Sequence, residues 1–209
     1  MKRRLKLKPF VLPAVYTLFV GILLITVFLA RKTLVGTKED DTIYVSGSIL
    51  DSYVPVVNLD TIIMRPYSSD KVTIGKDFYS YEDDATNQAN SIIYYENTYM
   101  QNSGVDYVAE ETFDVQTILD GEVIEVKKEE LLGNVVTIRH DNDIISVYQS
   151  LSEVNVEKGE QVSQGQIIGK SGTSALNPTL NNHLHFELMV KGQIKDPENY
   201  FDKKLGELE

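Results

Sequence analysis

An uncharged, strongly apolar run from Phe10 to Ala30 divides the chain into two parts with different surroundings. A helix of about 20 residues crosses the hydrocarbon core of a bilayer, which is about 30 Å thick. A cleavable secretory signal is the competing interpretation, but its apolar core is only about 7–15 residues long and small residues should mark a cleavage site after it. Here Arg31 and Lys32 follow directly. We therefore predict an uncleaved transmembrane helix at residues 10–30.

The charges that flank this run predict its orientation. Five Lys or Arg residues precede the run, two follow it directly, and residues 1–32 contain no acidic residue. The cytoplasmic flank of a transmembrane helix usually carries the larger positive charge. We therefore predict a cytoplasmic basic tail at residues 1–9, a single pass through the membrane, and an extracytoplasmic remainder.

The predicted extracytoplasmic part is strongly acidic. The whole chain has 20 basic and 31 acidic residues and a net charge of −11. Because seven of the basic residues lie within residues 1–32, the remainder holds 13 basic and 31 acidic residues, a net charge of −18. Such a surface repels nucleic acid, which we exclude as a partner. The charge either serves solubility alone or attracts a basic partner.

From residue 92 onward the pattern is that of short β-strands. Apolar and polar residues alternate in segments such as 113–129, which is typical of half-buried strands. There is no long amphipathic helix, internal repeat or glycine-rich phosphate loop. We predict an all-β domain built mainly of antiparallel sheet. Turn residues separate its strands at Asp120-Gly121, Gly133-Asn134, Asp141-Asn142-Asp143 and Lys191-Gly192.

Between the membrane and this domain we predict a linker. Residues 33–50 have the polar composition of a tether, and residues 54–64 that of a strand or docking segment at the domain edge. Residues 77–90 are compatible with either a short surface helix or a loop. The predicted boundaries are a linker at residues 31–75, a domain at 76–203 with its core at 92–202, and a tail at 204–209.

The chain contains three histidines and no cysteine. Any metal site must therefore be built from His, Asp and Glu. His183 and His185 lie two residues apart in a predicted strand, so their side chains share one face, as in half of a zinc site. The alternative is a pair of half-buried polar residues in a sheet. We interpret His140 as an ordinary residue at the end of a strand.

Longer motifs connect these histidines to a known family. The glycine-punctuated stretch at residues 156–172, followed by Asn182-His183-Leu184-His185-Phe186-Glu187, resembles the lysostaphin/LytM-type zinc peptidases. The segments Ser103-Gly104-Val105-Asp106 and Val147-Tyr148-Gln149-Ser150-Leu151-Ser152 resemble further motifs of that family, in the same order. The resemblance covers residues 92–202. It implies a LytM-like fold of the duplicated-hybrid-motif type and, in working members, cleavage of cell-wall peptides.

Carried over position by position, the resemblance implies zinc ligands at Asn102, Asp106 and His185, and catalytic residues at Ser150 and His183. Asn102 and Ser150 stand where working members have histidine. A neutral amide is a poor zinc ligand beside imidazole, and loss of a general acid or base costs about 10²–10⁴ in rate. We therefore expect no cofactor, no bound zinc unless the site is retained with other ligands, and no catalysis. Asp106, His183 and His185 are then vestigial.

A narrower resemblance is to a subgroup of this family that acts in endospore formation. It rests on the segments at residues 147–154, 168–172, 55–57 and 97–99. It implies a scaffold in the forespore membrane that faces the intermembrane space, helps engulfment and forms part of an intercellular channel. The implied partner is the ectodomain of stage III sporulation protein AH, and a ring-like oligomer fits this role. The alternatives are a zinc metalloendopeptidase and a regulator of hydrolases, both acting on cell-wall peptidoglycan.

Overall fold

The computed structural model describes Thr26, which lies in a helix, and residues 58–208. The chain divides into two compact units, Met1–Val54 and Pro55–Glu209. Apart from Thr26, the predicted basic tail, membrane helix and linker up to residue 57 lie outside the described residues, so they remain predictions. Within the described part of the chain, no helix is long and apolar enough to cross a membrane.

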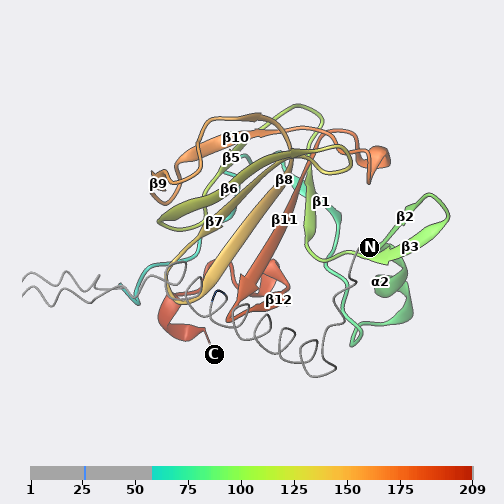
Figure 1. Ribbon diagram of the computed structural model, residues 1–209. Coiled ribbons are helices and arrows are strands. Elements are labelled where there is room, and N and C mark those ends of the chain that lie inside the picture. The colour runs from blue at the N-terminus through green and yellow to red at the C-terminus, as the bar shows by residue number, and fades with distance from the viewer. Residues whose placement is uncertain (1–25, 27–57, 209) are drawn as a thin grey trace, which may run out of the picture. The chain divides into compact units, whose positions relative to one another are not determined.

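The second unit is built around the predicted antiparallel sheet (Figure 1). β10 (Ile167–Ser171) pairs with β8 (Ile144–Val154) and with β5 (Asp114–Gln116), and β12 (Gln193–Lys195) pairs with β11 (His183–Val190). The main order of the sheet is β1 (Thr73–Lys76), β4 (Val105–Val108), β11 (His183–Val190), β8 (Ile144–Val154), β7 (Gly133–Arg139), β6 (Gly121–Glu129) and β9 (Gln161–Val162).

The remaining elements are short. β2 (Ile92–Tyr95) and β3 (Thr98–Gln101) form a separate two-stranded hairpin, which α2 (Ala85–Asn90) precedes. The sequence was compatible with either a helix or a loop at residues 77–90. The structure has a helix, α2, over the last six of these residues. Three 3-10 turns complete the unit: η1 (Pro178–Leu180), η2 (Pro197–Asn199) and η3 (Leu205–Glu207).

Three of the four predicted turns lie at hairpins, including Gly133 between β6 and β7, and the one at Asp120-Gly121 does not. Asn142 and Asp143 both have positive φ between β7 and β8, as do Lys191 and Gly192 between β11 and β12. Such backbone angles match the twist of two-residue hairpins. Gly121 instead begins β6 without a hairpin, because β5 pairs with β10 and β6 pairs with β7 and β9. A Cβ at Gly121 would lie 2.5 Å from the carbonyl oxygen of Arg139, so glycine is required by this close approach.

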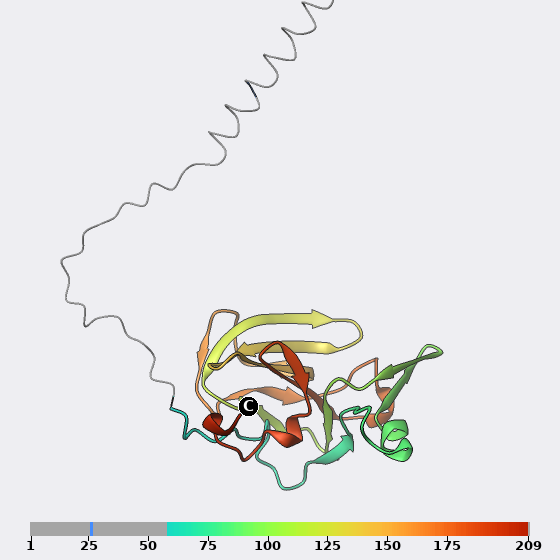
Figure 2. The same ribbon diagram turned by 90° about the horizontal axis from the view of Figure 1, so that it is seen from below.

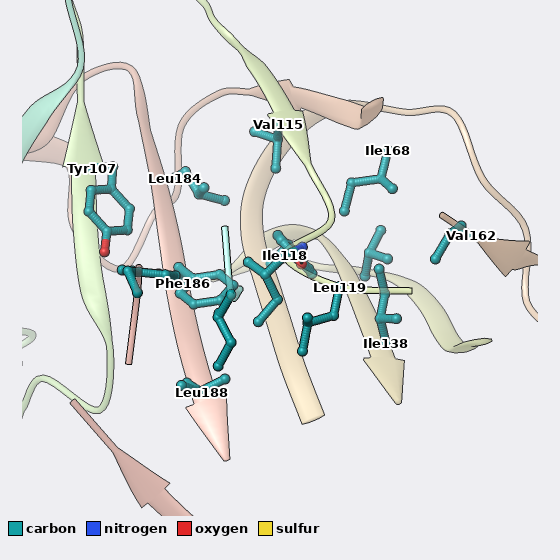
Figure 3. Close-up of a cluster of buried hydrophobic side chains, with 14 of the residues drawn as sticks. Tyr107, Val115, Ile118, Leu119, Ile138, Val162, Ile168, Leu184, Phe186 and Leu188 are labelled. Carbon is teal, nitrogen blue, oxygen red and sulfur yellow. Dashed lines mark hydrogen bonds between the residues drawn. The ribbon is translucent and has the colours of Figure 1, made fainter. Parts of the chain in front are cut away.

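The core fills the space that the curved sheet encloses (Figure 3). Leu184, Phe186 and Leu188 alternate along β11 and are fully buried, as the period of a strand dictates. The ring of Phe186 packs edge-on against Tyr148 of β8 at 5.1 Å between centroids. Side chains from five other segments complete this core: Val115, Ile118, Leu119, Ile138, Val162 and Ile168.

His140 is buried beside this core. Its Nδ1 donates to the carbonyl of Asp120 at 2.8 Å. Its Nε2 accepts a hydrogen bond from the hydroxyl of Ser146 at 2.7 Å. Burial lowers the pKa of His140 to about 4. The residue does follow the last residue of β7, but it is a neutral, buried part of the core rather than an ordinary strand-end residue.

The folded domain begins earlier and ends later than predicted. Ile63 is fully buried, and its backbone N–H donates to the carbonyl of Lys203 at 2.9 Å. Ile62 forms a β-bridge with Lys204, and Leu205 is buried in the core. The boundaries at residues 75 and 204 were therefore wrong. These segments pair over one or two residues only, so they carry no periodic pattern that reveals a strand.

An ion pair fastens this early segment to the end of the domain. The Arg65 guanidinium donates to both carboxylate oxygens of Glu198, at 2.8 and 3.0 Å, and lies 5.1 Å from the centre of the Phe201 ring. The hydroxyl of Tyr107 on β4 donates to the same carboxylate at 2.7 Å. A two-pronged Arg–carboxylate contact has a specific geometry, so it sets where residues 59–66 lie.

We expect Ile63→Ala to lower the free energy of unfolding of the unit at residues 55–209 by about 2–5 kcal/mol, as other large-to-small substitutions in cores do. Its neighbour Ile62 is 49% exposed, so Ile62→Ala should cost less than about 1 kcal/mol. Urea unfolding measures both values. Equal, small losses would mean that residues 59–66 are a linker after all.

Candidate functional site

The pairing of β4, β11 and β8 gathers the residues that the sequence singled out. Asp106 on β4 lies opposite His185 on β11, and Gln149 on β8 lies opposite His185 from the other side. Ser150 follows Gln149, and Asn102 precedes β4. Five site positions are therefore buried in one region of the sheet: Asn102, Asp106, Ser150, His183 and His185.

His185 lies between two carboxylates. Its Nδ1 donates to Asp106 at 2.9 Å, and its Nε2 lies 3.3 Å from Glu187, which also accepts a short hydrogen bond from the hydroxyl of Ser103. Burial alone would lower the pKa of His185, but the hydrogen bonds to Asp106 and Glu187 outweigh burial and raise its pKa to about 9. At neutral pH, His185 is a protonated imidazolium without a free lone pair.

The negative charge of Glu187 complements the positive charge of His185. Burial would raise the pKa of this carboxyl, but the hydrogen bonds from His185 and Ser103 hold its pKa below the ordinary value. Glu187 therefore keeps its negative charge although it is largely buried. The result is a hydrogen-bonded cluster in which two carboxylates share one imidazolium.

Asn102 acts as a cross-link between backbone segments. Its side-chain Nδ2 donates to the carbonyls of Asp77 at 2.9 Å and Gly104 at 2.8 Å, and approaches Asp106 at 3.4 Å. Its backbone N–H donates to the carbonyl of Ser91 at 3.0 Å, and its carbonyl accepts from the N–H of Tyr79 at 2.9 Å. Asn102 thus contacts five other residues of the chain.

His183 is buried and neutral. Its Nδ1 donates to the carbonyl of Asn181 at 2.9 Å, so its Nε2 accepts from the hydroxyl of Ser174 at 3.1 Å. Burial lowers the pKa of His183 more than its neighbours raise it. The imidazole therefore has the orientation and charge state of a proton acceptor, but its free nitrogen is already satisfied by a hydroxyl.

Ser150 occupies a bend in β8. Its φ is 64°, a left-handed backbone angle that costs a non-glycine residue about 1–2 kcal/mol. Before this residue β8 pairs with β11, and after it β8 pairs with β10. The N–H of Ser150 donates to the carbonyl of Leu132 at 2.8 Å, which supports the bend.

The residues at this site do not fit a catalytic zinc ion. Such an ion takes three protein ligands and leaves one position open for water. Both nitrogens of His185 face carboxylates, and Asn102 turns its amide nitrogen toward Asp106. The Asn102 Oδ1 is buried without a hydrogen-bond partner, but a neutral amide oxygen is a weak zinc ligand. In residues 58–208 no group of three or more His, Cys, Asp or Glu side chains could hold a metal ion.

Sequence reasoning missed three contacts of this site. Glu187 could have been found, because it lies two residues after His185 and therefore on the same face of the strand. Ser103 contacts Glu187 across 84 positions, and Ser174 contacts His183 from a loop. No periodic pattern reveals either contact, because one spans 84 positions and the other comes from an irregular loop nine residues away.

Similarity to known proteins identifies the class. Residues 100–197 match the profile of peptidase family M23. Stage II sporulation protein Q of Bacillus subtilis is 32% identical over 210 residues, which cover 97% of this chain and 74% of that protein. The chain therefore belongs to peptidase family M23. Within that family it is a relative of stage II sporulation protein Q.

A solved structure shows the same fold. The SpoIIQ–SpoIIIAH pore-forming complex matches with a TM-score of 0.68 and 36% identity, over 70% of this chain and 94% of that chain. The predicted LytM-like, mainly antiparallel β fold is thereby confirmed for the described domain. Peptidoglycan DD-endopeptidase ShyA of Vibrio cholerae is 37% identical over 91 residues, which cover 44% of this chain and 21% of that enzyme. The chain thus spans about a fifth of that enzyme's length.

Because the chain has only three histidines, NMR can follow the titration of each. We expect midpoints near pH 9 for His185 and near pH 4 for His140, with His183 below its ordinary value. Glu187→Gln should lower the midpoint of His185, because one carboxylate no longer stabilises its charge. A midpoint for His185 near 6.5 in the wild type would contradict the shared-proton cluster.

The same shifts predict how stability depends on pH. The raised pKa of His185 contributes stability that is complete below pH 6.5 and is lost as pH rises through about 9. The lowered pKa of His140 contributes stability that is complete above pH 6.5 and is lost as pH falls through about 4. Each loss is on the order of 3 kcal/mol. Together, these two histidines favour a maximum in the free energy of unfolding near pH 6.5. Urea unfolding at a series of pH values measures this dependence.

Proposed function

We propose that this protein is a non-catalytic M23 domain that serves as an assembly scaffold in endospore formation. The observation that carries the proposal is the use of Asn102. This residue stands at a position where the family resemblance implies a zinc ligand, yet its amide holds the carbonyls of Asp77 and Gly104. The relationship to stage II sporulation protein Q over nearly the whole chain supports the role in sporulation.

Two further features support the absence of catalysis. At the second replaced position, Ser150 has a hydroxyl in place of the imidazole expected there, and a serine hydroxyl is a poor general acid or base near neutral pH. His185 is already engaged by two carboxylates, Asp106 at 2.9 Å and Glu187 at 3.3 Å. Asp106, His183 and His185 are, in this proposal, remnants that now stabilise the sheet.

The proposed partner is the ectodomain of stage III sporulation protein AH. Support comes from the solved complex of SpoIIQ with SpoIIIAH, whose matched chain is 36% identical to this one. The domain would join that partner in the space between forespore and mother cell, contribute to engulfment and form part of an intercellular channel, with a ring-like oligomer as the assembly.

The proposed location follows from the chain outside the described residues. Residues 10–30 would anchor the protein in the forespore membrane, residues 1–9 would stay in the cytoplasm, and the domain would face outward. The second candidate function is that of a zinc endopeptidase on peptidoglycan. It is favoured by the retained Asp106, His183 and His185 and by the partial identity to ShyA.

The unit at residues 55–209 suits a direct test, because it carries its own hydrophobic core. We expect this unit to co-elute with the SpoIIIAH ectodomain of the same organism, to contain no stoichiometric zinc by metal analysis, and to leave purified peptidoglycan intact. A working M23 endopeptidase is the positive control for digestion. Stoichiometric zinc together with release of peptides would overturn the proposal in favour of the peptidase.

A further inference from the structure

Residues 77–101 form a unit at one side of the sheet, which we call the tyrosine module. It contains α2 and the hairpin of β2 and β3, and it follows directly after the edge strand β1. Both views show it projecting beyond the main sheet, at the end opposite β9 (Figures 1 and 2). β2 and β3 pair only with each other, so the module adds no strand to the main sheet.

The module carries the most exposed large apolar side chains of the described domain. Tyr81 is 82% exposed, Tyr99 is 73% exposed and Tyr94 is 57% exposed. Tyr94 and Tyr99 lie opposite each other in the hairpin, with 4.9 Å between ring centroids, and the Tyr94 hydroxyl donates to Asn97 at 2.8 Å. Rings held in this way lose little freedom on binding, which is why tyrosine is enriched in protein interfaces.

The charge of the module defines the kind of partner. It contains no lysine or arginine, and its acidic residues are Asp77, Glu82, Asp83, Asp84 and Glu96. Lys76 lies just outside and uses its ammonium group to bind the carbonyls of Asn90 and Ile92, both at 3.0 Å. Complementary charge steers association, so a uniformly acidic surface favours a basic protein surface and disfavours a second copy of itself.

Asn102 sets the position of this module relative to the sheet. Its contacts with Asp77, Tyr79 and Ser91 all lie within the module, whereas Gly104 and Asp106 lie at or on β4. The amide Nδ2 has two protons and serves two carbonyls, which a neutral imidazole with one N–H could not do. The same side chain therefore cannot both hold the module in this way and act as a histidine ligand.

We propose that the tyrosine module is the surface through which this domain binds a basic protein surface, with Asn102 as its positioning residue. The inference rests on the proposed scaffold function and assigns the binding of its partner to named residues. The occupant is a folded protein whose surface combines positive charge with apolar side chains, because the module carries an exposed tyrosine pair and five acidic residues without a lysine or arginine.

The first test replaces the aromatic pair. For the unit at residues 55–209 and the SpoIIIAH ectodomain, calorimetry should show Kd rising at least about tenfold in Tyr94→Ala/Tyr99→Ala, the range of interface hot spots. The matched control is Ile167→Ala/Ile194→Ala, which removes side chains 46% and 47% exposed on β10 and β12. The control should leave Kd within about twofold. Thermal unfolding verifies that both variants fold.

The outcomes separate this inference from the proposed function. Wild-type binding that the tyrosine substitutions leave unchanged would overturn the module as the docking surface, while the scaffold function would stand. Absence of wild-type binding would overturn both. Equal losses in the module and control variants would also contradict the inference. Sedimentation of the wild type alone checks for self-association. Dimers that the tyrosine substitutions abolish would instead identify a second copy as the occupant.

The acidic residues of the tyrosine module are tested separately. Glu82→Gln/Asp83→Asn removes two negative charges without touching the carboxylate of Asp84, which caps α2. The Kd of the wild type should rise with salt, and that rise should be smaller in the double variant. Salt dependence that is identical in the two proteins would contradict a basic partner surface at this module.

The positioning role is tested by Asn102→Asp, which keeps the shape but removes both N–H donors. We expect faster amide hydrogen exchange within residues 77–101, unchanged exchange in β7 and β8, and a weaker Kd. Asn177→Asp is the matched control, because Asn177 is a buried asparagine outside the module whose Nδ2 has no partner. An unchanged Kd for Asn102→Asp would exclude Asn102 as the positioning residue.

Discussion

The hydrogen-bonded pair of Asp106 and His185 joins β4 to β11, and the site is arranged around it. β11 is central because it also pairs with β8 and β12. Two charges buried at this seam cost several kcal/mol each in lost hydration, and only close pairing offsets that cost. Removal of one partner typically costs about 3–5 kcal/mol, because it leaves an uncompensated charge. The imidazolium of His185 thus supplies the positive charge that balances the two carboxylates beside it.

In the proposed scaffold, the retained residues serve this charge balance rather than chemistry. A metal ligand must offer a lone pair, whereas His185 donates to Asp106 and faces Glu187. Asn102 completes the change, because its amide protons point to backbone carbonyls. Residues kept for packing and charge balance look the same in a sequence as residues kept for catalysis. Only their hydrogen-bond partners distinguish the two.

Much of the fold could be predicted because strands leave a regular pattern. The alternation in residues 113–129, the turn at Asn142 and the shared face of His183 and His185 all follow from the period of a strand. The boundary at residue 75 could not be predicted from a local pattern. The segment before it is held by the single buried side chain of Ile63 and by the Arg65–Glu198 pair, which spans 133 positions. At the site, the family motif located the residues but not their partners, which come from distant segments.

The loss of a ligand and the position of the tyrosine module are physically connected. A side chain that binds a metal directs a lone pair inward, while one that holds a neighbouring segment directs protons at its carbonyls. Position 102 lies where the module joins β4. The residue type at this position therefore decides whether the side chain binds a metal or holds the module. With asparagine, the residues preceding β4 are fixed by hydrogen bonds that need no metal. Hydrogen bonds that position the module before binding would favour the proposed scaffold function, because a pre-positioned surface loses less entropy on binding.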